Sequence, residues 1–131
     1  MILRSGIDLV EINRFGDLKP ELRDRFLRRV FSDQELADCK GHDHKLAGRF
    51  AVKEAVAKAL GTGIGLVSWK EIEVITESEG EPRLVLHEKA AEYAEKLGLT
   101  QWSVSISHTA NHAIAMVVAI GEDADKESVQ P

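Results

Sequence analysis

Apolar and polar residues alternate through the first stretch of the chain, ILRSGIDLVEI, and this period of two predicts a β-strand. Ile7 and Leu9 point to one face of that strand, and Asp8 points to the other. Because aspartate is depleted from strands, Asp8 stands out as a candidate functional residue. From Pro20 to Val30 the apolar residues recur every four positions instead, which predicts a helix.

The next segment, FSDQEL, predicts a further helix that opens with a capping box, with Ser32 as the N-cap and Glu35 at the third helical position. CKGHDHK then has the composition of a loop. A central helix is predicted from about Lys45 to Leu60, and Gly61 fits a left-handed cap at its end. Since GTGIG follows this helix, its glycines do not lie where a phosphate-binding loop would place them.

Two hairpins are predicted in the second half of the chain. SWKEIEVITESEGEPRLVLHE alternates on both sides of a turn signal, EKAAEYAEKLG is helical, and WSVSISH returns after TANH as AIAMVVAI. Helices mixed with antiparallel pairs favour an α+β fold, an antiparallel sheet with packed helices, over a parallel sheet. We expect a single domain over residues 1–120 and a frayed polar tail over residues 121–131.

Composition restricts the class of protein. The chain has 131 residues, 44% hydrophobic and 30% charged, which is ordinary for a globular domain. Its longest apolar run has eight residues, against roughly 20 for a membrane helix, so no membrane association is expected. A lone Cys39 and the lack of a signal-like N-terminus predict a cytoplasmic protein. A net charge of −5 disfavours nucleic acid as a partner.

One segment is basic against this acidic background. RFGDLKPELRDRFLRRV, residues 14–30, holds six Lys and Arg residues against three acids. Two interpretations stay open: a solvated helix face, or a docking surface for an acidic partner.

Glu54 and Lys58 lie four residues apart on the central helix, in the order that stabilises a helix by about 0.2–0.5 kcal/mol as a surface ion pair. The residues one turn from Glu54 are mostly small or apolar, so the carboxylate is expected to be half-buried. With Asp8, this set suits a hard divalent cation such as Mg²⁺ and a phosphate-bearing substrate. His42 and His44 lack a third ligand at a usual metal-site spacing, and we interpret them as solvated loop residues.

The motifs in their order and spacing resemble the holo-acyl-carrier-protein synthases, the small phosphopantetheinyl transferases of bacterial fatty acid and lipid biosynthesis. The matching segments are GIDLVEINR, VFSDQEL, LAGRFAVKEAVAKALGTGIG, WKEIEV, GEPRLVL and VSISHT, and the match as a whole extends over about residues 2–120. The resemblance implies the 4′-phosphopantetheinyl transferase fold. It also implies transfer of 4′-phosphopantetheine from coenzyme A to a serine of apo acyl carrier protein, with release of adenosine 3′,5′-bisphosphate.

The same resemblance implies roles for single residues. Asp8 and Glu54 would be catalytic Mg²⁺ ligands, Lys58 a catalytic residue that contacts phosphate, and His108 a coenzyme-binding residue. The docking surface for the acidic carrier protein would comprise Arg14, Arg25, Phe26 and Arg29. A homotrimer with active sites between subunits is implied as well.

The expected chemistry is attack of the carrier serine on the β-phosphate of coenzyme A. Glu54, directly or through a metal-bound water, is the candidate base, and a water acting alone is the alternative. Two other function classes stay open on sequence grounds: a non-catalytic module that binds coenzyme A or the carrier protein, and a metal-dependent phosphohydrolase.

Overall fold

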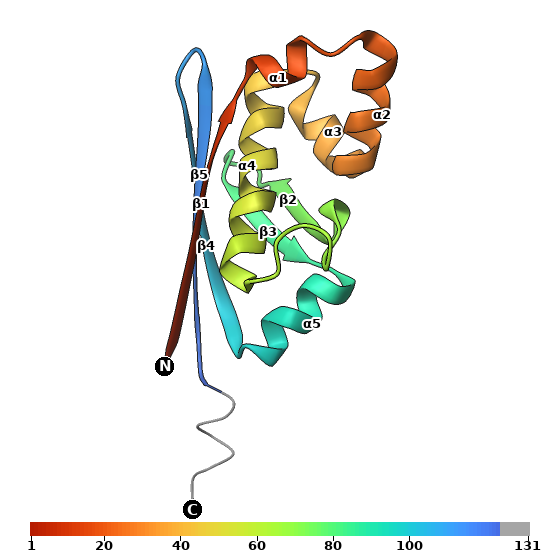
Figure 1. The fold of residues 1–131 in the computed structure, drawn as a ribbon. Coiled ribbons are helices and arrows are strands. Elements are labelled where there is room, and N and C mark those ends of the chain that lie inside the picture. Colours follow the sequence, from red (N-terminus) through yellow and green to blue (C-terminus); the bar gives the residue numbers. More distant parts are fainter. Residues whose placement is uncertain (124–131) are drawn as a thin grey trace, which may run out of the picture.

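A three-stranded antiparallel sheet forms one layer of the computed structural model, which describes residues 1–123 (Figure 1). It contains β1 (Ile2–Glu11), β4 (Leu99–His108) and β5 (His112–Gly121), in the order β1-β5-β4. The hairpin β4–β5 and the inward face of β4 confirm the predicted alternation. Of the tail expected to be frayed, residues 124–131 lie outside the described residues, and β5 ends at Gly121.

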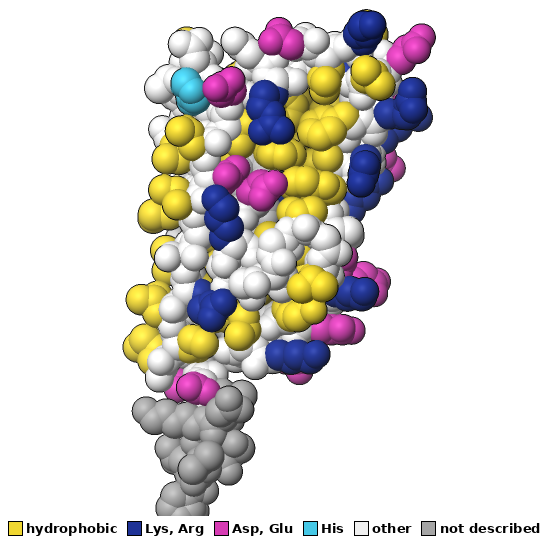
Figure 2. All heavy atoms as spheres, viewed as in Figure 1, with side chains coloured by type: hydrophobic (Ala, Val, Ile, Leu, Met, Phe, Trp, Pro, Cys, Tyr) yellow, Lys and Arg dark blue, Asp and Glu magenta, His cyan; other side chains and the backbone are white. Residues whose placement is uncertain are grey.

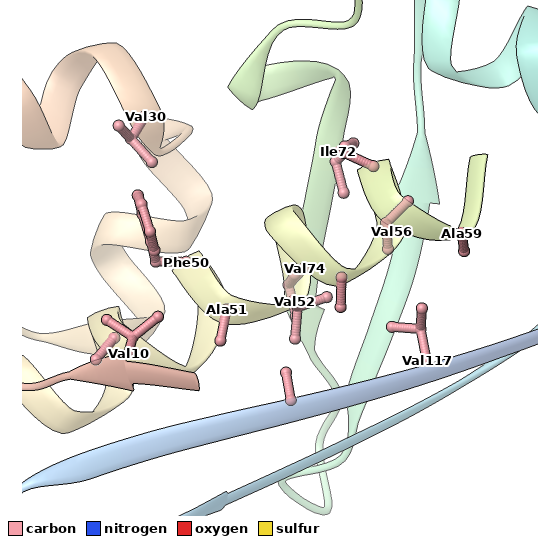
Figure 3. Close-up of a cluster of buried hydrophobic side chains, with 14 of the residues drawn as sticks. Val10, Val30, Phe50, Ala51, Val52, Val56, Ala59, Ile72, Val74 and Val117 are labelled. Atoms are coloured by element: carbon pink, nitrogen blue, oxygen red, sulfur yellow. The ribbon is translucent and has the colours of Figure 1, made fainter. Parts of the chain in front are cut away.

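The central helix, α4 (Asp43–Leu60), lies across one face of this sheet and buries most of its own surface (Figure 1). Small side chains make the close approach possible: a Cβ atom on Gly6 of β1 would lie 1.8 Å from the carbonyl oxygen of Ala55. Figure 3 shows the resulting core, in which Ala51 and Ala59 of the helix point toward the sheet that carries Val117. The close helix–sheet contact holds the side chains on the two flanks of α4 in fixed places.

Three short helices cover the N-terminal end of α4: α1 (Asn13–Gly16), α2 (Pro20–Val30) and α3 (Asp33–Cys39) (Figure 1). The predicted capping box at the start of α3 is present, because Ser32 Oγ accepts from the backbone N–H of Glu35 and the Glu35 carboxylate accepts from the N–H of Ser32.

A second, two-stranded sheet packs beside α4 and is made of β2 (Ile72–Thr76) and β3 (Pro82–Leu86). It is preceded by the short 3₁₀ helix η1 (Trp69–Glu71) and followed by α5 (Glu88–Lys96). Both hairpins and the helix between them confirm the predictions, and the whole is the α+β arrangement expected from the sequence.

The predicted loop over CKGHDHK is wrong at both ends. Cys39 still belongs to α3, and α4 begins at Asp43, which leaves only residues 40–42 between the helices. Lys40 adopts a left-handed conformation, φ 50°, that ends α3, and His42 is extended as the N-cap of α4. The acidic Asp43 in the first turn suits the positive end of the helix. Gly61, with φ 77°, caps the other end as predicted.

The face of the three-stranded sheet that points away from α4 is exposed, and it is apolar over β1 and β5. Its large apolar side chains are Leu3, Ile7, Leu9, Ile114, Met116 and Ile120, with exposed fractions between 36% and 66%. The strand β4 contributes the exposed Ser103, Ser105 and Ser107 to this face. Figure 2 shows hydrophobic side chains along the sheet side of the molecule. Within residues 1–123, no helix has the length and apolarity needed to cross a membrane.

Candidate active site

Asp8 and Glu54 bring two carboxylates together at the contact between β1 and α4. Asp8 points toward the helix, with its side chain 18% exposed, and Glu54 is half-buried as predicted. Burial, and next the negative charge of Asp8, raise the pKa of Glu54 above its ordinary value, against the opposing effect of Lys58 and Arg14. Two half-buried carboxylates that repel each other fit a divalent cation, because the ion would neutralise both.

Lys58 completes this group from the same helix. Its Nζ donates to the carbonyl oxygen of Ile7 at 2.8 Å and to Asp8 Oδ1 at 3.3 Å. Among the described residues its ion-pair partner is Asp8, and the simple surface pair with Glu54 is not formed. The side chain remains 54% exposed. Lys58 therefore partly neutralises the charge of Asp8, and its ammonium group still faces solvent.

Two residues of the predicted docking surface meet above Phe50 of α4. The Arg14 guanidinium lies 5.6 Å from the centre of the Phe50 ring, and the Phe26 ring centre lies 6.1 Å from it. Trp69 stacks on the same ring at 4.8 Å. Phe50 is one helical turn before Glu54, so this surface adjoins the carboxylate pair. Phe50 and Trp69 were not singled out from the sequence.

Exposed basic residues of the predicted docking surface continue along α2. Arg25 and Arg29 are exposed, and Arg29 lines an open cavity of about 370 Å³ together with Trp69 and Lys70. Figure 2 shows Lys and Arg side chains along this side, next to a cluster of hydrophobic side chains. Arg23 of the same segment turns inward instead, and it pairs with Asp43 at 2.8 Å.

His108 lies away from the carboxylate pair. Its ring centre is 4.7 Å from that of His44, in the first turn of α4. Glu54 is ten residues further along the helix, roughly 15 Å at 1.5 Å per residue. One copy of the chain therefore does not bring His108 to Asp8, Glu54 and Lys58. His44, expected to be a solvated loop residue, instead belongs to a helix and contacts another imidazole.

Arg49 marks a second cavity, which was not predicted from the sequence. Only 9% of Arg49 is exposed, and it shares a cavity of about 360 Å³ with Pro82, Ser105 and Ile106. Its guanidinium donates to Thr76 Oγ1 at 2.7 Å, whereas its Nε has no hydrogen-bond partner. Five residues separate Arg49 from Glu54, a rotation of roughly 140° on a helix, so the two occupy opposite flanks of α4.

A buried ion pair joins α4 to α3. Lys53 and Glu35 have no exposed surface, and Lys53 Nζ donates to Glu35 Oε1 at 2.8 Å. The two remaining protons go to the carbonyl oxygens of Trp69 and Ile72. From the sequence, Glu35 was expected only in a capping box. The apolar residues one turn away from Lys53 on the helix were the signal that it is buried.

Comparison with known proteins assigns the arrangement to a family. A family model described as ACPS, 4′-phosphopantetheinyl transferase superfamily, matches residues 4–117. This chain belongs to the 4′-phosphopantetheinyl transferase superfamily. A holo-[acyl-carrier-protein] synthase of Herpetosiphon aurantiacus is 43% identical over 127 residues, which cover 92% of this chain and all of the relative.

Solved structures agree with this phosphopantetheinyl transferase assignment. A holo-[acyl-carrier-protein] synthase of Helicobacter pylori in complex with coenzyme A superposes with a TM-score of 0.80 at 36% identity, over 88% of this chain and 99% of that one. A Bacillus anthracis holo-(acyl-carrier-protein) synthase, described with CoA (3′,5′-ADP), gives 0.72 at 34% identity, over 91% and 96%. The chain is thus an enzyme that moves a 4′-phosphopantetheinyl group from coenzyme A to acyl carrier protein.

Proposed function

We propose that this phosphopantetheinyl transferase works at a site where Asp8 and Glu54 hold Mg²⁺ and Lys58 contacts phosphate. The observation that carries the proposal is the pair of half-buried carboxylates beside an exposed lysine, next to the surface around Phe50. When bound, the ion would neutralise charge on the phosphoryl oxygens of coenzyme A.

In the proposed reaction the serine hydroxyl of the carrier protein attacks the β-phosphorus of coenzyme A. The bond from that phosphorus to the bridging oxygen breaks, and adenosine 3′,5′-bisphosphate leaves. Glu54 accepts the serine proton, directly or through a water. Lys58 stabilises negative charge on the departing bisphosphate.

The acidic carrier protein would dock on Arg14, Arg25, Phe26 and Arg29. Exposed arginines attract it over a distance, and the apolar surface of Phe26 beside Phe50 gives it a place to pack. Because Phe50 and Glu54 are one turn apart on α4, a carrier bound there presents its serine near the carboxylates.

We further propose a homotrimer in which neighbouring subunits share each active site. The exposed apolar face of the three-stranded sheet is a surface that a second copy of the chain can cover. The Arg49 cavity and the carboxylate pair lie on opposite flanks of α4, so one chain cannot present both to the same coenzyme A molecule. Both can reach one coenzyme A if one copy supplies Arg49 and His108 and its neighbour supplies the carboxylates. A cytoplasmic location stays a prediction from the sequence.

Mass spectrometry of apo acyl carrier protein incubated with the protein, coenzyme A and Mg²⁺ tests the function. The expected result is a carrier that gains the phosphopantetheine mass, and loss of this gain when Mg²⁺ is chelated. A binding module would leave the carrier mass unchanged, and a phosphohydrolase would cleave coenzyme A without a carrier.

Co-expression of Glu54→Gln with His108→Ala tests the shared site. Each variant alone is expected to be nearly inactive. Mixed oligomers are expected to recover activity, because some sites then combine an intact Glu54 from one subunit with an intact His108 from the next. Failure to recover activity in verified mixed oligomers would contradict the shared site.

A further inference from the structure

We propose that Arg23 is a positioning residue for binding of the carrier protein. Its ion pair with Asp43 holds α1 and α2 in the orientation that forms the docking surface. The inference rests on the proposed function, since it concerns the surface proposed to bind acyl carrier protein. It separates Arg23 from the exposed arginines of α2, which would contact the carrier directly. It also gives an acidic residue, Asp43, a part in binding an acidic partner.

Arg23 turns inward from α2, whereas the other arginines of that helix are exposed. The Arg23 side chain is 24% exposed, against 74% for Arg28. Its Nη1 donates to the carbonyl oxygen of Phe15, and its Nη2 lies 2.8 Å from Asp43 Oδ1. The guanidinium of this α2 residue therefore reaches α1 through Phe15 and the first turn of α4 through Asp43.

Phe15, whose carbonyl oxygen Arg23 binds, is packed under the docking surface and is only 2% exposed. Its ring centre lies 5.8 Å from that of Phe26 and 5.7 Å from that of Phe50. Arg14, Phe15 and Phe26 also line one small cavity of about 120 Å³. A shift of α1 against α2 would therefore change how Arg14 and Phe26 are presented to the carrier.

The first half of α2 depends on Arg23 for its inward contacts. This helix lies on the outer side of the three that cover the N-terminal end of α4 (Figure 1). From Pro20 to Arg25 every residue is exposed except Arg23, whereas Val30 at the other end is fully buried. The contacts of Arg23 thus hold the half of the helix that carries Arg25. A docking surface ordered in advance binds its partner with a smaller loss of conformational entropy.

Charge alone and positioning predict opposite effects for Asp43→Asn. The Asp43 carboxylate repels an acidic carrier, so on charge alone its removal would lower the KM for the carrier. If the carboxylate instead holds Arg23 in place, the same substitution releases the first half of α2 and raises that KM.

Arg23→Lys separates the two effects a second time, because it keeps the positive charge. The single nitrogen of an ammonium group cannot take the places of both terminal guanidinium nitrogens, one at the Phe15 carbonyl and one at Asp43. On charge alone the KM for the carrier would stay unchanged in this variant, and positioning predicts that it rises.

Steady-state kinetics with acyl carrier protein as the varied substrate, at saturating coenzyme A and Mg²⁺, measures the effect. We expect the KM for the carrier to rise about threefold to fivefold in both Asp43→Asn and Arg23→Lys. The kcat should stay near wild type, because the carboxylate pair lies further along α4, and an unchanged kcat also shows that the variants fold. Asp24→Asn is the matched control, since it removes an acid whose partner Arg28 is exposed. It should not raise the KM.

A KM for the carrier that fell in Asp43→Asn, or that stayed unchanged in Arg23→Lys, would overturn this inference alone. The proposed docking surface would itself be wrong if Arg29→Glu also left that KM unchanged. Failure of the wild-type protein to transfer phosphopantetheine would overturn the proposed function.

Discussion

Two lysines of α4, five residues apart, are each paired with a carboxylate, and their surroundings differ in every respect. Lys53 and Glu35 are fully buried, and all three protons of Lys53 have acceptors. Lys58 is 54% exposed and lies 3.3 Å from Asp8, beside the half-buried Glu54. The first pair has no capacity left for a ligand.

The difference separates a structural ion pair from one suited to catalysis. A saturated buried pair joins α3, α4 and β2, because Glu35 Oε2 also accepts the N–H of Val74 at 2.9 Å. Lys58 pairs only with Asp8 and does not neutralise Glu54. The Lys58 ammonium group and the Glu54 carboxylate therefore both stay available to a substrate. Substitution of each lysine by methionine tests this contrast.

Lys53→Met should destabilise the fold by about 3–5 kcal/mol, because it leaves the Glu35 carboxylate buried without its counter-ion. Lys58→Met, the matched control on the same helix, should change stability by less than about 1 kcal/mol. Urea unfolding followed by circular dichroism gives both values. Equal effects of the two substitutions would remove the distinction between the pairs.

Catalytic activity should depend directly on Lys58, the lysine whose substitution has the smaller effect on stability. Lys58→Met should reduce kcat by a factor of about 10²–10³, the range for loss of one group that stabilises transition-state charge. The readout is the rate of adenosine 3′,5′-bisphosphate release at saturating coenzyme A and carrier protein. If Lys58→Met kept the wild-type kcat, Lys58 would have no catalytic role, and its ion pair with Asp8 would be its whole contribution.

Arg29→Glu extends the contrast to charges that act on a partner protein. The KM for acyl carrier protein should rise about tenfold, near 1.4 kcal/mol, with the KM for coenzyme A unchanged. Arg28→Glu is the control on the same helix, since Arg28 already pairs with Asp24 at 3.2 Å. A rise confined to the KM for coenzyme A would contradict the docking surface.

Glu54→Gln should produce the smallest effect on stability, an increase below about 1 kcal/mol without metal, because solvent contact screens the charge. The pKa of Glu54 is raised from 4.5, so its proton-bound form stabilises the fold at low pH, and that contribution is lost as the pH rises through the raised pKa. The gain in the variant should therefore appear as the pH rises above the raised pKa of Glu54 and should be absent in acid.

Urea unfolding at several pH values, with and without Mg²⁺, measures this effect. Added Mg²⁺ should stabilise wild type more than the variant, as expected for a ligand that binds only the folded state. A variant that is less stable than wild type at neutral pH without metal would show that the Glu54 charge is not disfavoured there.

The segments predicted correctly from the sequence share one property: residues close by in the sequence determine their local structure. The capping box of Ser32 and Glu35, the left-handed cap at Gly61 and both hairpins depend on contacts within a few residues. Glu54 was predicted to be half-buried from its own helical neighbours. The same reasoning applied to Lys53 would have found a buried lysine, although not its partner.

Tertiary structure decided the pairs that are distant along the chain. Glu35 and Lys53 are 18 residues apart, and Asp8 and Lys58 are 50 apart. His44 was assigned to a loop, and its contact with His108 depends on where the first turn of α4 meets the end of β4. Which flank of α4 each side chain occupies is readable from the helical period. What faces that flank is set by packing of the sheet against the helix, and no local pattern encodes it.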